Sequence, residues 1–119
     1  MKDSIVIVKA EEVEPIVFDT NEAKGVMKRV LIGRSSGAAN FFMRLFSLEP
    51  GGHSPLHRHP WEHEVFIVNG EATIVTDNEH RIAKRGASVF VPGNALHQFR
   101  NETSESLEFI CVVPSSGEE

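Results

Sequence analysis

Short apolar runs separated by turn residues follow one another along the chain, and none shows the sustained period of a helix. Turn pairs such as Asn69-Gly70 and Asp77-Asn78 interrupt the runs about every ten residues. This pattern is typical of an all-β sandwich or barrel. Strands are predicted at 4–9, 16–18, 26–32, 41–48, 65–68, 71–76, 81–83, 87–92, 97–101 and 107–113.

Alternation within two of these strands predicts which face is buried, because successive side chains of a strand point to opposite sides. One face of the last strand carries no charge, and we expect that face to point into the barrel. Its residues are Leu107, Phe109, Cys111 and Val113. In the strand 41–48, Arg44 shares a face with three apolar residues. Two positions for Arg44 stay open, one inside the barrel and one at its rim in solvent.

The chain of 119 residues is long enough for one domain with its own core. We expect short N-terminal strands at 1–25, a barrel core at about 26–113 and a frayed tail at 114–119. The net charge of −5, with basic and acidic residues intermixed, offers no basic stripe to a nucleic acid. The first apolar run is too short for a signal peptide or a membrane span. With a single cysteine, this predicts a cytoplasmic protein that binds a small molecule and no membrane.

Histidines gather in one stretch of the sequence. His57, His59 and His63 fall within seven residues, and His97 follows downstream. On a roughly continuous strand the first three share one face. Crowded imidazoles repel one another when protonated and leave buried nitrogens without partners, and a metal ion relieves both effects. The alternative is a set of solvated loop histidines, but the orderly spacing favours a metal site.

Two spaced motifs carry a resemblance to a known family. The first is similar to G-x5-H-x-H-x3,4-E-x6-G and consists of Gly51, His57, His59, His63 and Gly70. The second is similar to G-x5-P-x-G-x2-H-x3-N and consists of Gly86, Pro92, Asn94, His97 and Asn101. Through them the chain resembles a small single-domain cupin, and within that superfamily the four-histidine manganese cupins. The resemblance implies a double-stranded β-helix, or jelly-roll barrel.

The chain departs from these motifs at two positions. His63 stands where the family usually has Glu; Glu64 also fits the looser spacing, but it lies on the opposite strand face, so we predict His63 as the ligand. Asn94 replaces a glycine, which is a mild change because Asn also tolerates the left-handed conformation. His53 and His80 fall outside both motifs and are predicted as surface residues.

The resemblance implies one divalent transition-metal ion per chain, held by His57, His59, His63 and His97. It favours Mn(II), with Fe(II), Ni(II), Zn(II) and Cu(II) as alternatives because all-nitrogen sites bind several ions of this series. Ligand histidines must be neutral, so metal affinity should fall as the pH drops below about 6.5.

Four neutral imidazoles leave the charge of such an ion uncompensated, so an anionic small-molecule substrate is expected. We predict Arg44 as an anchor and Phe109, Cys111 and Val113 as pocket-lining residues. The predicted function is a manganese- or iron-dependent oxygenase or oxidase of the dioxygenase type. A non-redox isomerase or lyase and a non-catalytic ligand-binding cupin are the alternatives. The resemblance also implies a homodimer that pairs through its N-terminal strands.

Overall fold

Antiparallel strands build almost the whole structure, a computed structural model that describes residues 4–117. The strands are β1 Ile16–Phe18, β2 Lys24–Ile32, β3 Phe41–His53, β4 His63–Asn69, β5 Glu71–Val75, β6 His80–Lys84, β7 Ser88–Val91, β8 Gln98–Arg100 and β9 Leu107–Pro114. Three short 3-10 helices accompany them, η1 Ala10–Glu12, η2 Arg34–Ser36 and η3 Ser115–Gly117. None of the helices in residues 4–117 is long and apolar enough to cross a membrane. The predicted all-β class is confirmed.

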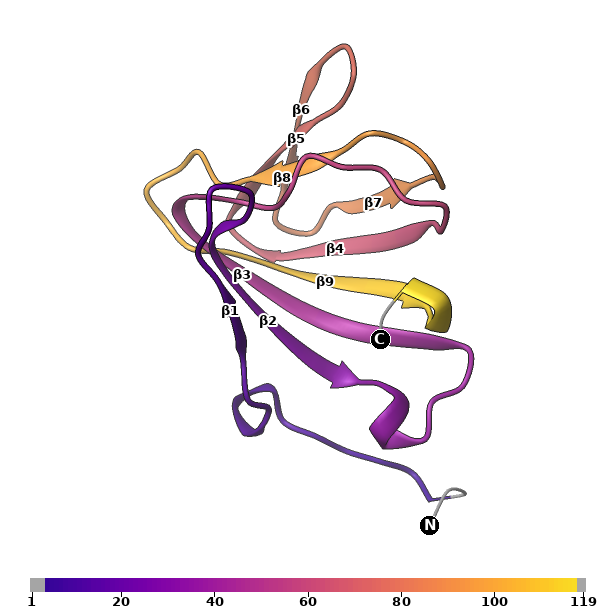
Figure 1. The fold of residues 1–119 in the computed structure, drawn as a ribbon. Helices are drawn as coiled ribbons and strands as arrows, with labels where there is room; N and C mark the ends of the chain where they lie inside the picture. Colours follow the sequence, from indigo (N-terminus) through magenta and orange to yellow (C-terminus); the bar gives the residue numbers. More distant parts are fainter. Residues whose placement is uncertain (1–3, 118–119) are drawn as a thin grey trace.

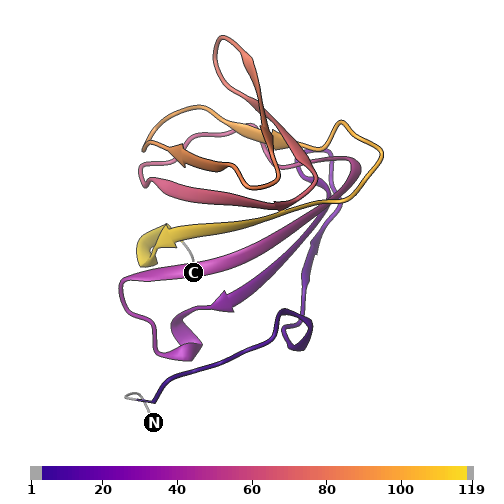
Figure 2. The same cartoon turned by 180° about the vertical axis from the view of Figure 1, so that it is seen from behind.

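The strands form one sheet in the order β6-β5-β8-β3-β9-β4-β7, and β2 and β1 extend it from β3. The long strand β3 joins the two halves of the barrel. Its first part pairs with β9, while His53 at its end pairs with Arg100 of β8, so the sheet curves back on itself. The result is a nearly closed barrel in which β8, β5 and β6 lie across from β9, β4 and β7 (Figures 1 and 2). Strands β6 and β7 end the sheet and leave a seam between them.

The barrel interior is filled by the faces that alternation predicted. Every second residue of β9 from Leu107 to Val113 is buried, with exposed fractions of 4% or less. Aromatic rings stack through the interior, with Phe109 between Phe46 at 5.3 Å and Phe99 at 4.9 Å. Arg44 is 8% exposed, so of its two open positions the structure selects the inner one.

Both ends of the chain differ from the sequence-based expectations. The strand expected at 4–9 does not form, because this extended segment has no neighbouring strand among residues 4–117 to complete a hydrogen-bond ladder. Pro114 belongs to β9 and residues 115–117 form η3 in place of a frayed tail. Gly117 lies so close to the Trp61 ring that a methyl group there would come within 2.7 Å of the indole nitrogen, so this end of the chain packs on the side chain of Trp61. Residues 118–119 lie outside the described part.

Candidate metal centre

Backbone pairing brings the first and last histidines together. The amide of His57 donates to the carbonyl of His97 at 3.1 Å, and the amide of His97 donates to the carbonyl of His57 at 3.0 Å. Such a pair places two side chains on the same side of a ladder. The centroids of the two imidazole rings are accordingly 4.9 Å apart.

A tight turn before His97 packs against the loop that carries His59. Asn94 has φ 66°, which confirms that asparagine takes the left-handed conformation at this motif position. The backbone amide of Asn94 donates to the His59 carbonyl at 2.6 Å. Gly93 beside it has no room for a side chain, since a Cβ atom would lie 2.5 Å from the Pro60 carbonyl oxygen. This close contact holds the rings of His59 and His97 with centroids 4.9 Å apart.

The four predicted ligands converge, although by a different route from the one expected. His57 and His59 lie in the loop 54–62, and only His63 lies on a strand, at the start of β4. The shared strand face predicted for these three residues is therefore wrong, because the chain leaves the extended conformation between them. Candidate ligand atoms of His57, His59 and His97 all lie within 4.8 Å of one another.

His63 reaches this group from the opposite side of the barrel. Its Nε2 atom lies 3.3 Å from Nε2 of His97, and its ring centroid lies 5.2 Å from that of His59. A metal–imidazole bond of about 2.0–2.1 Å places neighbouring ligand nitrogens about 3 Å apart, so the His63–His97 spacing fits two ligands of one ion. The assignment of His63 as the fourth ligand stays a prediction.

The Nδ1 atoms of three histidines lie within hydrogen-bond distance of a protein group. His59 Nδ1 lies 3.0 Å from the Trp61 carbonyl, and His97 Nδ1 lies 2.8 Å from the Ala95 carbonyl. His63 Nδ1 lies 3.1 Å from Sγ of Cys111. A histidine that donates its Nδ1 proton in this way presents the lone pair of Nε2, the arrangement that ligand histidines normally show. The donor set therefore fits a transition-metal ion.

Burial and mutual repulsion favour the neutral forms of His57, His63 and His97. The pKa of His57 falls to about 4 and that of His63 to about 3; burial is the main cause, followed by the repulsion of His97 and then of His59. The Arg44 guanidinium further lowers the pKa of His63. Burial also lowers the pKa of His97, although the hydrogen bond to the Ala95 carbonyl acts in the opposite direction and raises it. The sequence predicted that metal affinity would fall below a pH of about 6.5. With these lowered pKa values, protons compete with a metal at His57 and His63 only at a more acidic pH.

Among residues 4–117, no carboxylate belongs to the histidine cluster. Glu64 is exposed on the outer face of β4, where it lies opposite Phe90 and Val112, while neighbouring His63 is 7% exposed and points inward. The choice between these two residues by strand face agrees with their burial. Within residues 4–117 no aspartate or glutamate is buried, so the candidate centre combines imidazoles with one buried cation, Arg44.

The four predicted pocket residues lie inside the barrel. Arg44 donates from Nη2 to Sγ of Cys111 at 3.1 Å and from Nε to the Cys111 carbonyl at 3.3 Å. Its guanidinium lies 5.3 Å from the centre of the Phe46 ring. Phe109 and Val113 are 4% and 1% exposed. Their buried positions agree with the interior expected of them, and their contact with a substrate stays a prediction.

A pocket of about 400 Å³ opens at the seam between β6 and β7. It reaches His97 at one end, and Ile82 and Phe90 line its sides. The side chains of Arg81 and Lys84 add positive charge to the lining. The pocket was not predicted from the sequence, because β6 and β7 stand at opposite ends of the strand order. They become neighbours only when the sheet curves into a barrel.

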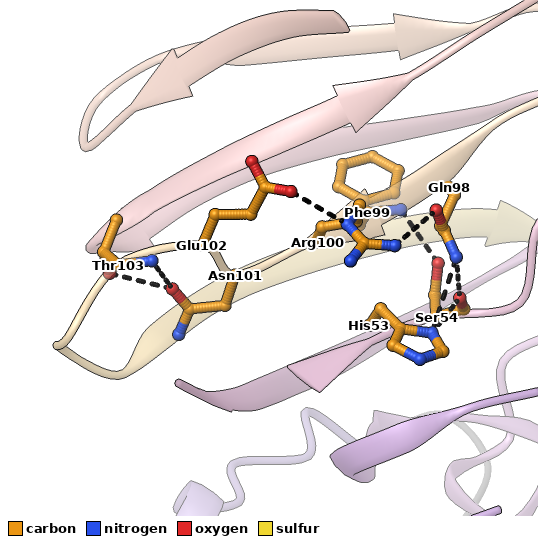
Figure 3. Close-up of polar contacts among 8 residues, drawn as sticks. All are labelled: His53, Ser54, Gln98, Phe99, Arg100, Asn101, Glu102 and Thr103. Carbon is orange, nitrogen blue, oxygen red and sulfur yellow. Dashed lines mark hydrogen bonds and ion pairs between the residues drawn. The ribbon is translucent and has the colours of Figure 1, made fainter. Parts of the chain in front are cut away.

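The last motif residue has a structural task that the sequence reading left unassigned. Asn101 is 1% exposed, and its amide donates to the carbonyls of Leu48 at 2.9 Å and Glu105 at 2.7 Å. Its Oδ1 accepts hydrogen bonds from the amide and hydroxyl of Thr103 (Figure 3). These bonds fix the end of β8, four residues after His97. The fixed motif spacing was the available sequence signal for this role.

The two histidines outside the motifs do not belong to the cluster, and the predicted surface position is confirmed for His80 but not for half-buried His53. His53, at the end of β3, contacts the Ser54 carbonyl at 3.1 Å and the Gln98 amide at 3.4 Å (Figure 3). His80 is exposed at the start of β6.

Trp61 stacks on the ring of His59 with centroids 4.3 Å apart and an interplanar angle of 7°, so it supports a predicted ligand directly.

Comparison with known proteins agrees with this architecture. Residues 44–113 match the Cupin_2 family, described as a cupin domain. Over 71 residues, 60% of the chain, the sequence is 37% identical to the 1-methylthio-D-xylulose 5-phosphate methylsulfurylase of Rhodospirillum rubrum. The chain spans only 46% of the length of that relative.

Solved structures extend the likeness over nearly the whole chain. The polyketide cyclase RemF from Streptomyces resistomycificus superposes with a TM-score of 0.88 and 26% identity, over 94% of this chain and 80% of that one. A cupin-2 domain structure from Rhodospirillum rubrum superposes with a TM-score of 0.81 and 27% identity, over 92% of this chain and 74% of that one.

Proposed function

The chain belongs to the cupin family, and from this premise we propose that it is an enzyme that holds one divalent transition-metal ion on His57, His59, His63 and His97. The observation that carries the proposal is the convergence of the four imidazoles, with Nε2 of His63 and His97 facing each other at 3.3 Å. Two facing lone pairs at this distance repel unless a cation or a proton lies between them. A proton between them requires either an added positive charge, which the lowered pKa values of both residues oppose, or the Nε2–H form of one ring, which would give up a hydrogen bond donated from Nδ1. Both costs favour a metal.

Manganese is the ion that we propose first, and iron is the second. An octahedral ion with four imidazole ligands would offer two further positions and Lewis acidity to a substrate. Because the donor set is all nitrogen, nickel, copper and zinc are expected to bind as well. The ion in a purified sample will therefore depend on which metal was supplied.

The substrate that we propose is a small organic anion. A centre without a buried carboxylate in residues 4–117, and with the buried Arg44 guanidinium beside Cys111, has an excess of positive charge. The pocket at the β6–β7 seam provides room beside His97, and Arg81 and Lys84 suit an anionic group there. Substitution Ile82→Trp should narrow this pocket and raise KM while leaving the metal content unchanged.

Oxygen-dependent chemistry, as an oxygenase or oxidase, is the first candidate reaction. A non-redox isomerase or lyase needs a positioned general base, and residues 4–117 contain no buried carboxylate for that role. An ion with two open positions suits reactions in which substrate and dioxygen bind side by side. The cytoplasmic location and the small-molecule partner remain predictions from the sequence.

A non-redox reaction is the second candidate, and the relatives favour it. Their names give a methylsulfurylase and a polyketide cyclase, and neither is named an oxygenase. The methylsulfurylase acts on a sugar phosphate by its name, which is an anionic substrate of the proposed class. A ligand-binding cupin without turnover is the remaining alternative.

The deciding experiment compares turnover with and without dioxygen. Protein loaded with Mn(II) or Fe(II) is incubated with small carboxylates and with 1-methylthio-D-xylulose 5-phosphate, and both oxygen uptake and product are measured. The first candidate predicts oxygen uptake that depends on the metal and disappears in the His97→Ala variant. Turnover under anaerobic conditions would move the assignment to the second candidate, and binding without any turnover would leave a binding protein.

A further inference from the structure

One residue of the barrel interior contacts both a predicted ligand and the buried cation. Cys111 projects inward from β9 and is 2% exposed. Its Sγ atom lies 3.1 Å from Nδ1 of His63 and 3.1 Å from Nη2 of Arg44. The three side chains come from β9, β4 and β3, which are neighbours in the sheet. Strand pairing explains both contacts. Cys111 lies directly opposite Arg44 of β3, and it lies opposite Val65 of β4, two residues along the same strand face from His63.

The direction of the hydrogen bond between Arg44 and Cys111 follows from the donors. Arg44 carries only N–H donors, so Sγ of Cys111 accepts from it. A sulfur atom already oriented as an acceptor toward Arg44 can also accept the Nδ1 proton of His63 at 3.1 Å. The competing site for that proton is Nε2 of His63, which faces Nε2 of His97 at 3.3 Å. The position of one proton therefore decides whether Nε2 of His63 presents a lone pair to the centre.

We propose that Cys111 is a positioning residue for His63: its sulfur, fixed by Arg44, holds the imidazole proton on Nδ1 and leaves Nε2 free toward the other histidines. Carbonyl groups do the same for His59 and His97, through Trp61 and Ala95. The inference rests on the proposed metal centre, because a free Nε2 matters most if an ion binds there. Outer partners of this kind typically change metal affinity by about 10–100-fold.

The test uses substitutions that separate the acceptor from the volume of the side chain. Cys111→Val fills a similar space without a hydrogen-bond acceptor, and Cys111→Ser keeps an acceptor. Leu107→Val is the matched control, since it trims another buried residue on the same face of β9, four positions from Cys111. Circular dichroism and thermal unfolding establish that each variant is folded.

The first readout is the protonation of the His63 ring in the metal-free protein, read from nitrogen-15 chemical shifts at a pH of about 7.5. Wild type, Cys111→Ser and Leu107→Val should show the Nδ1–H form. Cys111→Val should shift toward the Nε2–H form, in which His97 is the remaining acceptor. An Nε2–H form in the wild type, or no change in Cys111→Val, would overturn the inference whether or not the protein binds metal.

The second readout is the affinity for Mn(II) alone, titrated by the electron paramagnetic resonance signal of the free ion. Cys111→Val should bind about 10–100-fold more weakly than wild type, with Cys111→Ser within about tenfold and Leu107→Val unchanged. Equal affinities in wild type and Cys111→Val would contradict the positioning role while leaving the metal centre intact. A wild type that binds neither Mn(II) nor Zn(II) but shows the expected ring protonation would refute the proposed function and support the role of Cys111 in orienting His63.

Discussion

At the scale of single residues, the histidines of the centre use their two nitrogens differently. His59 and His97 each direct Nδ1 to a backbone carbonyl, so Nε2 is the atom available to an ion, and we propose the same for His63 through Cys111. The sequence predicted which histidines converge, because the motif spacing fixes them. It did not predict their acceptors, since Cys111 lies 48 residues from His63 and meets it only through strand pairing.

The lowered pKa values predict a stability that depends on pH. His57 and His63 titrate near 4 and 3 in the folded protein and near 6.5 when unfolded, so the unfolded chain binds more protons between these values. Metal-free protein should keep this stabilisation above about pH 6.5 and lose it progressively as the pH falls toward the folded-state pKa values. The measurement is the urea-unfolding free energy at about pH 7 and about pH 5. His63→Leu should show a smaller loss between these two conditions, and an equal loss in both proteins would contradict the attribution to His63.

At the scale of elements, two loops and one strand end assemble the centre. The turn before His97 packs on the loop that carries His59, and β4 brings His63 from the opposite side. Alternating apolar residues were sufficient to predict the strands and the buried face of β9. The strand predicted at 4–9 was wrong because its alternation was read without a pairing partner, and pairing is a property of the folded sheet.

Close packing between the loops predicts a strong effect at Gly93. A methyl group there would lie 2.5 Å from the Pro60 carbonyl oxygen, a backbone atom, so the two loops must move apart. Gly93→Ala should weaken Mn(II) binding about tenfold or more, because a displaced ligand no longer meets the others. Gly37→Ala is the control: it has φ 94° and open space, so it should cost about 1 kcal/mol of stability and leave binding unchanged. Unaltered Mn(II) affinity in Gly93→Ala would show that the contact between the loops does not position His59 and His97.

At the scale of the whole molecule, the N-terminal segment leaves the barrel and exposes a row of apolar side chains. Ile5 and Ile7 are 91% and 88% exposed, and Val6 and Val8 are 43% and 38% exposed. The ribbon shows this end of the chain running away from the barrel (Figure 1). Four consecutive exposed aliphatic residues are typical of a segment that is covered in an assembly. The homodimer indicated by the sequence remains our proposal, with the segments 5–8 packed on a second copy.

This proposal predicts that charge in the segment disrupts the dimer. Ile5→Lys combined with Ile7→Lys places two charges in the expected interface without touching the barrel core, so the folded monomer should persist. Sedimentation velocity should show a dimer for wild type and a monomer for the variant. The control is Ile82→Lys, which places a charge at an exposed position of β6, outside the N-terminal segment. It should leave the assembly unchanged. A wild-type monomer at micromolar concentration would refute the dimer.

The central claim is that converging histidines hold one metal ion, and elemental analysis of protein purified without a histidine tag tests it most directly. Wild type, His97→Ala and Glu64→Ala are loaded with Mn(II), passed through a desalting column and measured side by side. Our account predicts about one ion per chain in wild type and in Glu64→Ala, whose side chain faces away from the centre, and a large loss in His97→Ala. Wild-type protein without bound metal, or a Glu64→Ala variant that loses metal as His97→Ala does, would contradict it.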